Sequence, residues 1–363
     1  MIESPARLTA SVVGGGFGGQ LSLSALAQSS RFDLVAAADL QAGVRRDLEA
    51  KFPGLKTFEN HHELFADCPT DVVCVSTFPP SHETVVMDAL ELPLRGILVE
   101  KPLGHTSASG QRLLKAIQTR HLPMATPHNL LAKDASLEIL ARVWNGEIGD
   151  LRLLEVQCQH WDIINAGIHW FHFFVRLTRN DPPSWVMAAC DSSSRTFRDG
   201  MQVETIAVSY VQTLGGVRAV MNTGDHVVVN PEANGFETLF RIVGTQGQIE
   251  YPAWSDSYRL QNATHPHGAH FTVPDAPVSG HQRHLEHLAA QIAAGAPDYT
   301  IPESSLLALE LCEGAYLSSQ HRCQVRFPLT GFVPPSVVPP SATDWQPGQP
   351  YNGTGGGRDG RKL

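Results

Sequence analysis

The 363-residue sequence has no apolar run that approaches the roughly 20 residues of a membrane span. Its first residues, MIESPARLTA, lack the basic segment followed by an apolar one that marks a secretory signal. Basic residues are few, since 27 Lys and Arg stand against 36 Asp and Glu, and the formal net charge is -9. An acidic surface disfavours nucleic acid and anionic membranes as partners. We therefore expect a cytoplasmic protein that binds neither.

Cysteine is scarce as well: the six cysteines are scattered and form no C-x-x-C pair. This spacing is typical of reduced, mostly buried thiols and argues against a zinc site or a disulfide framework. Two groups of histidines stand out, but a metal site usually brings acid or cysteine ligands with a closed geometry, so we predict no metal and a polar rim around a pocket. These groups are His265, His267 and His270, and His281, His284 and His287.

Glycine, in contrast, is concentrated in the segment SVVGGGFGGQ, residues 11–20. A buried-strand pattern precedes it and a helical pattern follows it, and its spacing fits G-x-G-x-x-G at Gly14, Gly16 and Gly19. The first glycine permits the tight turn, the second lets a pyrophosphate approach the backbone, and the third lets helix and strand pack closely. The helix N-terminus then offers N–H groups to the phosphates. The alternative is a glycine-rich surface turn.

A carboxylate follows the next predicted strand, since Asp39 ends the apolar run FDLVAAADL, 20 positions after Gly19. At this place a carboxylate accepts hydrogen bonds from the adenosine ribose hydroxyls and repels a 2′-phosphate, which favours NAD over NADP. The alternatives are a helix cap or loop aspartate, and a 2′-phosphate bound by Arg45 or Arg46.

The first 126 residues alternate strand and helix patterns, which predicts a doubly wound parallel sheet, an α/β Rossmann domain. From residue 127 the pattern changes to strands joined by glycine or asparagine turns, which predicts an α+β domain with a large, mainly antiparallel open sheet. Helices at 281–294 and 303–319 are expected to close this domain. The last 33 residues hold six prolines and are expected to form a mobile or extended tail. The predicted domains are residues 1–126, 127–330 and 331–363.

Ligands of such parallel sheets lie beyond the carboxyl ends of the strands. The segments GGGFGG, ADL, STFPP and EKPLG all follow predicted strands, so we expect them to meet at one edge. With these motifs, the GEIG of residues 146–149 and the G-x-H of residues 167–169, the chain resembles the Gfo/Idh/MocA family of NAD(P)-dependent sugar and cyclitol oxidoreductases over residues 8–328. The resemblance implies a catalytic cleft between two domains and packing through the open sheet into a homodimer or homotetramer.

The resemblance also implies roles for individual residues. Lys101 corresponds to the active-site lysine, Pro102 to a proline that often follows a cis peptide, and His169 to the histidine that faces the substrate hydroxyl. We expect Lys101, His169 and Asn165 to be catalytic. The positions expected to contact the cofactor are Gly14, Gly16, Phe17, Gly18, Gly19, Asp39, Thr77, Pro79, His82, Glu100 and Lys101. The positions expected to contact the substrate are Lys101, His128, Trp161, Asp162, Asn165, His169 and His172.

The sequence departs from the family pattern beside this histidine. The family usually has an aspartate four residues before it and often one three residues after it, whereas this chain has Asn165 and His172. Asparagine forms hydrogen bonds but supplies no charge. Asp162, one turn earlier, is the candidate substitute. A basic residue that the family usually has after His128 is also missing, and this favours a neutral substrate.

Oxidation of an alcohol to a ketone needs a hydride acceptor and a proton acceptor, and NAD supplies the first. We predict Lys101 as the second, on condition that burial and a nearby positive charge make it a better base than a free lysine. His169 is the alternative base. The main hypothesis is an NAD-dependent oxidoreductase acting on a secondary hydroxyl of a neutral sugar, glycoside or cyclitol, with free or tightly bound cofactor. The alternatives are a glycosidase that uses transient oxidation and a non-catalytic NAD-binding sugar sensor.

Overall fold

The computed structural model describes residues 7–191, 196–229 and 237–335, and the chain divides into two compact units. Unit 1 comprises Met1–Asn129 and Pro277–Leu306, and unit 2 comprises Leu130–Ala276 and Leu307–Leu363. The stretch 277–306 therefore belongs with the first unit, whereas the sequence analysis assigned it to the second domain. From residue 336 onward the predicted tail lies outside the described residues.

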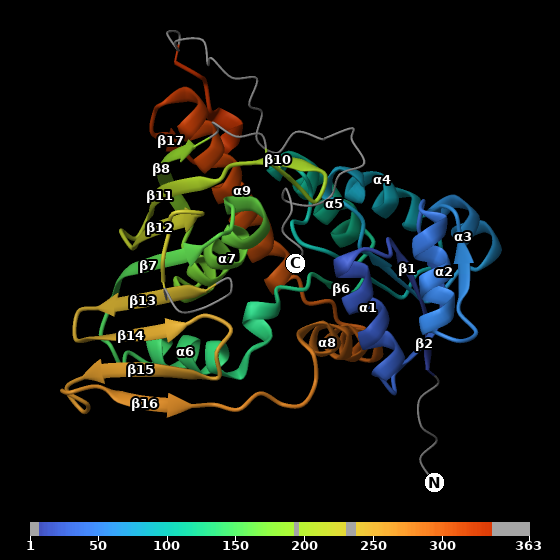
Figure 1. The fold of residues 1–363 in the computed structure, drawn as a ribbon, viewed down its shortest axis with the longest axis horizontal. Helices are drawn as coiled ribbons and strands as arrows, with labels where there is room; N and C mark the ends of the chain where they lie inside the picture. Colours follow the sequence, from blue (N-terminus) through green and yellow to red (C-terminus); the bar gives the residue numbers. More distant parts are fainter. Residues whose placement is uncertain (1–6, 192–195, 230–236, 336–363) are drawn as a thin grey trace. The chain divides into compact units, whose positions relative to one another are not determined.

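Unit 1 is built on a six-stranded sheet in which every neighbouring pair is parallel (Figure 1). The strand order is β3-β2-β1-β4-β5-β6. This is the strand order of a dinucleotide-binding sheet: the chain adds β2 and β3 on one side of β1, and then β4, β5 and β6 on the other side. The strands are β1 (Leu8–Val13), β2 (Phe32–Ala38), β3 (Lys56–Phe58), β4 (Val72–Val75), β5 (Gly96–Val99) and β6 (Met124–Ala125).

Helices cover both faces of this sheet, because alternate side chains along each strand point to opposite faces. Val73, Val75 and Val99 pack with α3, α4 and α5. On the other face, Cys74 and Leu98 pack with α1, α2 and α8. The predicted Rossmann architecture is thus confirmed. The helices are α1 (Phe17–Gln28), α2 (Ala42–Lys51), α3 (His61–Asp67), α4 (Pro79–Ala89), α5 (Ser107–Thr119) and α8 (Gly280–Ala294).

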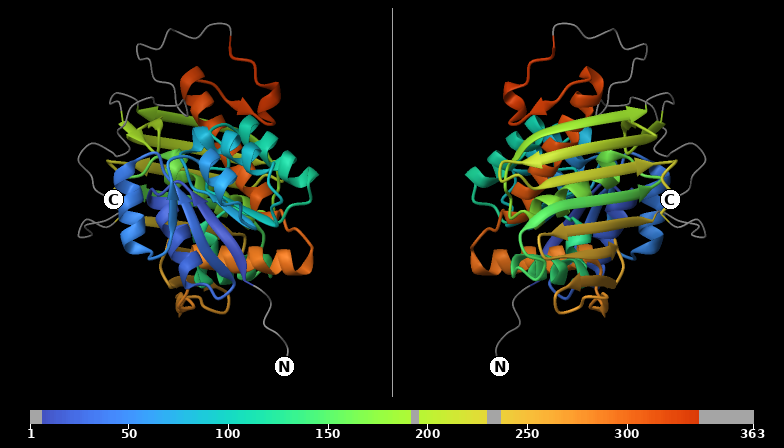
Figure 2. Two further views of the ribbon diagram at one scale, coloured as in Figure 1. Left: turned by 90° about the vertical axis from the view of Figure 1, so that its right-hand side faces the viewer. Right: turned by 90° about the vertical axis from the view of Figure 1, so that its left-hand side faces the viewer.

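Unit 2 contains a nine-stranded sheet in the order β16-β15-β14-β13-β7-β12-β11-β8-β17. Every pair is antiparallel except β7 with β12, so the predicted, mainly antiparallel sheet is confirmed. The right-hand view of Figure 2 shows one face of it with no described helix of this unit in front. The strands are β7 (Leu151–Gln159), β8 (Pro183–Asp191), β11 (Ile206–Thr213), β12 (Arg218–Gly224), β13 (Thr238–Gly244), β14 (Gly247–Pro252), β15 (Ser257–Asn262), β16 (Ala269–Thr272) and β17 (Val325–Arg326).

The helices of unit 2 include one that is buried almost all round. In α7 (Ile168–Leu177), nine of ten residues are buried, and Trp170 packs edge-on against Phe240 of β13. A five-residue π-helix, η2 (Ile163–Gly167), leads directly into α7. π-Helical turns are rare and frequently mark functional sites. The remaining elements are α6 (Asp134–Trp144), α9 (Thr300–His321), which begins in unit 1, the short helices η1 (Asn129–Ala132) and η3 (Leu329–Gly331), and the hairpin of β9 (Thr196–Arg198) and β10 (Met201–Val203).

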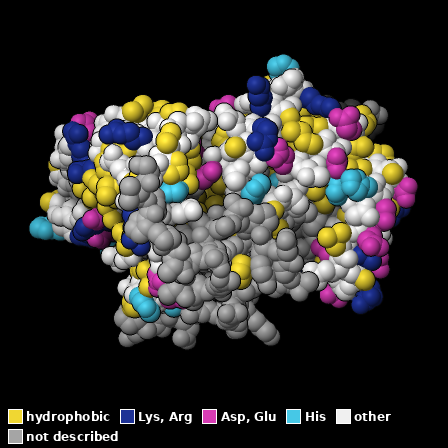
Figure 3. All heavy atoms as spheres, turned by 90° about the horizontal axis from the view of Figure 1, so that it is seen from above, with side chains coloured by type: hydrophobic (Ala, Val, Ile, Leu, Met, Phe, Trp, Pro, Cys, Tyr) yellow, Lys and Arg dark blue, Asp and Glu magenta, His cyan; other side chains and the backbone are white. Residues whose placement is uncertain are grey.

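Acidic, basic and apolar side chains are interspersed on the face seen in Figure 3, and its described residues form no continuous field of one charge. No helix in the described part of the chain is long and apolar enough to cross a membrane. All six cysteines carry free thiols.

Candidate functional site

The glycine turn joins β1 to α1 at the carboxyl end of the sheet. Gly14 has φ +97°, and a Cβ there would lie 2.5 Å from the carbonyl oxygen of Ser76. A Cβ on Gly19 would lie 1.9 Å from the carbonyl oxygen of Gly14, so the helix and the turn touch through backbone alone. Gly16 differs, because a Cβ there would meet no described atom within 4 Å. Space is thus left at Gly16, beside the N-terminus of α1, where a phosphate is favoured.

Asp39 follows β2 and is hydrogen-bonded to the glycine turn. Its Oδ2 accepts the backbone N–H of Gly15 at 2.8 Å, and its Oδ1 accepts that of Gln41 at 2.8 Å. Each carboxylate oxygen has a second lone pair that can receive a further donor. The guanidinium of Arg45 donates to the backbone carbonyl of Asp39 at 2.8 Å, so this cation is held by the strand end.

The loops after β4 and β5 are joined through His82. Its Nε2 lies 2.9 Å from the carbonyl oxygen of Thr77, and its Nδ1 lies 3.0 Å from that of Pro102. Burial lowers the pKa of His82 below its ordinary value, although both carbonyls favour the protonated ring. A neutral ring donates to only one carbonyl at a time. His82 therefore ties two loops together from inside unit 1, and Pro79 begins α4 between them.

Glu100 and Lys101 follow β5. Glu100 is 7% exposed, and its Oε2 accepts the backbone N–H of Lys101 at 3.2 Å. Burial acts to raise the pKa of Glu100, but His281 and Lys101 outweigh it and hold that pKa below the ordinary value. The peptide bond between Lys101 and Pro102 is cis. Unit 1 thus collects the predicted cofactor residues at the ends of β1, β2, β4 and β5, which lie side by side in the sheet.

His128 lies inside unit 1. Its side chain is fully buried, its Nε2 lies 2.7 Å from Oγ of Ser305, and its backbone carbonyl is hydrogen-bonded to His284. The residues after it, Leu130 and Leu131, are buried in unit 2 with 1% and 7% exposure. No charged side chain therefore stands at positions 130 and 131, where the family usually has a basic residue.

In unit 2, Asp162 caps the π-helix. Its Oδ1 accepts both the backbone N–H and the side-chain Nδ2 of Asn165, each at 2.8 Å. Its Oδ2 lies 3.3 Å from Nη1 of Arg198, whose guanidinium also stacks on the ring of Trp161 at 3.6 Å from the centroid. Asp162 is fully buried and Asn165 is 3% exposed. The aspartate therefore orients the asparagine.

A second buried carboxylate lies in the same cluster. Glu204 accepts the backbone N–H of Ile163 at 2.7 Å and the hydroxyl of Tyr316 at 2.8 Å. Burial and the neighbouring Asp162 raise the pKa of Glu204 to about 7. Arg198, Glu204 and Tyr316 could not be predicted from the sequence, because no local motif links them to residues 162–165. Arg198 lies on β9, Glu204 directly follows β10, and Tyr316 lies on α9.

His169 lies in the first turn of α7, six residues after the start of the π-helix. It is 9% exposed, and its ring lies 5.4 Å from that of Trp254 in an edge-on arrangement. His172, one turn later, is fully buried. Trp254 is 38% exposed and has φ +71°. Unit 2 thus brings Trp161, Asp162, Asn165, His169 and His172 onto one continuous segment, and it adds Trp254, which the sequence analysis missed.

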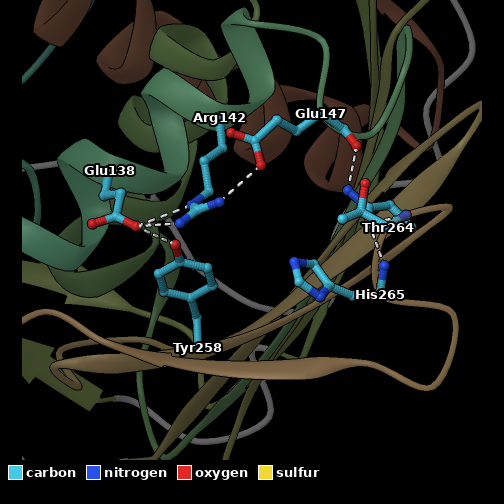
Figure 4. A network of polar contacts seen from close by, with 7 residues as sticks. Glu138, Arg142, Glu147, Tyr258, Thr264 and His265 are labelled. Carbon is cyan, nitrogen blue, oxygen red and sulfur yellow. Dashed lines mark hydrogen bonds and ion pairs between the residues drawn. The ribbon is translucent and has the colours of Figure 1, made fainter.

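Unit 2 also contains a polar network that includes none of the residues predicted to act on substrate (Figure 4). Arg142 pairs with Glu138 and Glu147, each at 2.8 Å, and Tyr258 donates to Glu138 at 2.6 Å. Burial opposes the charge on Arg142, but the two carboxylates keep its pKa above the ordinary value. A polar pocket of about 320 Å³ adjoins this network. Its lining is Glu147, Gln246, Asn262, Ala263, Thr264 and His265.

Among the described residues, one group brings three potential metal-ligand atoms within 4.8 Å of one another: His61, His62 and Asp88. Within it, Nε2 of His61 lies 2.9 Å from Oδ2 of Asp88, as in an ordinary histidine–carboxylate pair. Neither histidine group singled out in the sequence belongs to it.

A family model matches the N-terminal third of the chain, and curated relatives match most of it. Residues 8–128 match the model of the "Oxidoreductase family, NAD-binding Rossmann fold". The "Uncharacterized oxidoreductase YfiI" of Bacillus subtilis is 25% identical over 304 residues, which are 71% of this chain and 72% of that one. The "Rhizopine catabolism protein MocA" of Rhizobium meliloti is 25% identical over 332 residues, which are 85% of this chain and 94% of that one.

Solved structures share the fold of most of the chain. An oxidoreductase from Agrobacterium radiobacter, solved with NAD+, L-tartaric acid and magnesium, superposes with a TM-score of 0.76 at 16% identity and covers 88% of this chain and 98% of its own. GenD2 from gentamicin A biosynthesis, solved with NAD, gives 0.73 at 19% identity and covers 88% and 96%.

The Rossmann sheet, the glycine turn and the matched family model define an NAD-binding oxidoreductase. Residues 8–128 match the Gfo/Idh/MocA family model, in agreement with the resemblance that the motifs predicted. The expectation of an NAD-type cofactor is confirmed with it.

Proposed function

We propose that this oxidoreductase interconverts a secondary hydroxyl and a ketone on a neutral sugar, glycoside or cyclitol. The observation that carries the proposal is a pair of proton-handling side chains, Lys101 after β5 and His169 in the first turn of α7. NAD, when bound, accepts the hydride, and the protein must still take up the hydroxyl proton. A protein that only senses NAD needs neither side chain.

The residues of unit 1 fit NAD. Gly16 leaves space beside the start of α1, whose first turn contains no acidic side chain and no side-chain cap. Backbone N–H groups there suit a pyrophosphate. Asp39 suits the ribose hydroxyls and disfavours a 2′-phosphate, and Arg45 is already bonded to the carbonyl of Asp39. These contacts support NAD over NADP.

Lys101 is the proposed proton acceptor, and His169 shares that role. The tie between Glu100 and the backbone N–H of Lys101 supports this assignment, because a base must be held in position to act. Asn165 is proposed to bind a substrate hydroxyl. Asp162 holds its amide nitrogen, so Asp162 acts on the substrate through Asn165.

A neutral, hydroxyl-bearing substrate is supported by two observations. Positions 130 and 131 hold buried leucines where a basic residue would bind an anion. Trp161 and Trp254 offer aromatic faces of the kind that pack on sugar rings. Among the structures with the same fold is KijD10 of Actinomadura kijaniata, a 3-ketoreductase solved with TDP-benzene and NADP at a TM-score of 0.72 and 17% identity.

The open sheet face supports a homodimer or homotetramer. Met187 of β8 pairs with Tyr210 of β11, and Ala189 pairs with Val208, so these four share one face. Met187 and Val208 are 49% and 47% exposed. Exposed apolar side chains gathered on one sheet face favour association.

Light scattering after size exclusion tests this proposal. The double variant Met187→Glu with Val208→Glu is expected to yield monomers, whereas Leu214→Glu, in the nearby turn, is expected to leave the oligomer unchanged.

The redox proposal is tested by the absorbance of reduced nicotinamide while sugars, cyclitols and glycosides are added with NAD supplied or withheld. Growth of the band only with added NAD identifies a dehydrogenase. Growth without added NAD, limited to one turnover, identifies a tightly held cofactor. No growth with any compound, despite NAD binding, contradicts the proposal, and net hydrolysis of a glycoside would then identify the glycosidase.

The matched variants are Lys101→Ala and Lys115→Ala. Lys115 lies exposed on α5 in the same unit. We expect Lys101→Ala to lower kcat by 10²-fold or more, roughly the contribution of a general base. Lys115→Ala is expected to leave kcat unchanged.

A further inference from the structure

The second histidine group of the sequence, in GHQRHLEH, lies on α8, inside unit 1. His281 is 3% exposed, and burial lowers the pKa of His284 to about 4. The side chain of His287 is 54% exposed and lies 3.7 Å from Asp298. The three side chains therefore lie in different surroundings, and two of them are core residues. This corrects the expectation of a polar rim around a pocket.

His281 contacts the loop that carries Lys101. Its Nε2 lies 2.6 Å from Oε1 of Glu100, and its Nδ1 lies 3.0 Å from Nδ2 of Asn129. The other oxygen of Glu100 accepts the backbone N–H of Lys101. A continuous series of polar contacts thus runs from Asn129 through His281 and Glu100 to the backbone of Lys101.

Glu100 also touches the glycine turn. A Cβ placed on Gly18 would lie 3.2 Å from Oε1 of Glu100, so this carboxylate packs directly against the first turn of α1. One carboxylate therefore contacts three segments: the start of α1, the loop after β5, and α8. Glu100 thus supports the backbone of Lys101 by a hydrogen bond and lies in packing contact with the glycine turn.

Titratable side chains from β4, α4 and α8 influence Glu100 or are influenced by it. Burial raises the pKa of Cys74 on β4, and burial lowers the pKa of His82 on α4 and of His284 on α8. These three groups are neutral at pH 7. Two basic side chains then face Glu100: His281, which is hydrogen-bonded to it, and Lys101. Of the two, His281 does more to hold the pKa of Glu100 below its ordinary value.

On the side away from Glu100, Nδ1 of His281 meets the side-chain amide of Asn129. With Nδ2 turned toward His281, the buried Oδ1 of Asn129 has no hydrogen-bond partner among the described residues. Which amide atom is oxygen and which is nitrogen is assigned from such contacts. Turning the amide by half a rotation places Oδ1 against Nδ1 of His281, where it accepts a hydrogen bond if that nitrogen carries the proton, and moves Nδ2 to the position that Oδ1 occupied.

We infer that His281 is a positioning residue for the proposed reaction: through Glu100 it fixes the backbone of Lys101 beside the glycine turn and keeps Glu100 ionised. The inference rests on the proposed function of Lys101. Its test therefore includes one measurement that needs no substrate.

That measurement is the titration of Glu100, followed by carbon-13 NMR of labelled glutamate side chains in the full-length protein, with Glu100→Gln identifying the signal. In His281→Gln the glutamine still donates a hydrogen bond but carries no charge. We expect the midpoint of Glu100 to rise by about one pH unit or more, whereas His287→Gln, on the exposed side of the same helix, leaves it unchanged. An unchanged midpoint in folded His281→Gln would refute the inference, whatever the substrate.

Activity supplies the second measurement. A carboxylate with a lowered pKa contributes above its folded-state pKa and loses its effect as the pH falls through that value. Raising the pKa by His281→Gln should therefore move the acidic limb of the kcat/KM profile to higher pH, and NAD affinity should change less than threefold. In the Glu100→Gln background the same change should have no further effect on kcat. A uniform fall in kcat with an unmoved profile would show a purely structural role and overturn the inference.

Discussion

Nη1 of Arg198 lies 3.3 Å from Oδ2 of Asp162, and both side chains are almost completely buried. The pair supports the π-helix that leads to His169, because Asp162 accepts two hydrogen bonds from Asn165 of that helix. The orientation of a residue proposed to bind substrate thus depends on a cation from the distant hairpin of β9 and β10.

Removing Arg198 leaves the Asp162 carboxylate buried without its cation. We expect Arg198→Ala to lower the free energy of unfolding by about 3–5 kcal/mol, as for other broken buried pairs. The matched control is Arg152→Ala, which removes an exposed pair with Asp150 and should cost less than about 1 kcal/mol. Urea denaturation at pH 7 measures both, and equal losses in the two variants would contradict the prediction.

Glu204 makes the stability of the protein depend on pH. Its folded-state pKa of about 7 lies above the ordinary value of 4.5, so the folded state binds the proton more tightly than the unfolded state. Stability is then expected to fall as the pH rises from about 4.5 to 7, by up to about 1.4 kcal/mol per pH unit. Glu204→Gln keeps the contacts to Ile163 and Tyr316 and should flatten this part of the profile.

Thermal or urea unfolding between pH 5 and 8 checks the Glu204 prediction. Glu59→Gln, on the surface of unit 1, serves as the control and should leave the slope unchanged. A slope that persists in Glu204→Gln would assign the titration to another group.

The second and third glycines of the motif are expected to respond differently to the same substitution. In Gly19→Ala the new Cβ overlaps the carbonyl oxygen of Gly14, so the unfolding free energy should fall by about 1–3 kcal/mol. In Gly16→Ala the Cβ enters open space, so stability should stay within about 0.5 kcal/mol. NAD affinity should nevertheless fall by about tenfold or more in Gly16→Ala, which calorimetric titration measures. Unchanged NAD affinity would mean that the pyrophosphate does not approach Gly16.

Much of unit 1 could be predicted because its signals are local. The turn after β1, Asp39 after β2 and EKPLG after β5 each lie at a strand end, and parallel order alone brings them to one edge. The cluster around Asp162 could not be predicted, since Arg198, Glu204 and Tyr316 reach it only through tertiary folding. The assignment of α8 to the second domain was wrong for the same reason: Leu285 and Leu288 pack on the Rossmann sheet after a long excursion of the chain.

The family's aspartate cannot simply be restored at position 165. The Nδ2 of Asn165 lies 2.8 Å from Oδ1 of Asp162, so Asn165→Asp would set two carboxylates against each other beside the guanidinium of Arg198. Two carboxyl groups at this distance do not both ionise readily, so the pKa of one of them is raised. Stability should therefore fall with rising pH, and the variant should lose about 1–3 kcal/mol more at pH 8 than at pH 5.

Exchanging the two residues gives the decisive comparison. In the double variant Asp162→Asn with Asn165→Asp, one carboxylate remains, the amide nitrogen of residue 162 donates to it, and the amide oxygen still accepts from Arg198, whereas the backbone N–H of residue 165 loses its acceptor. The part of the lost stability at pH 8 that is due to charge repulsion should then return. If the double variant is as unstable at pH 8 as Asn165→Asp alone, charge repulsion is not the reason that asparagine occupies this position. If stability returns while turnover does not, position 165 itself must supply an amide to the substrate.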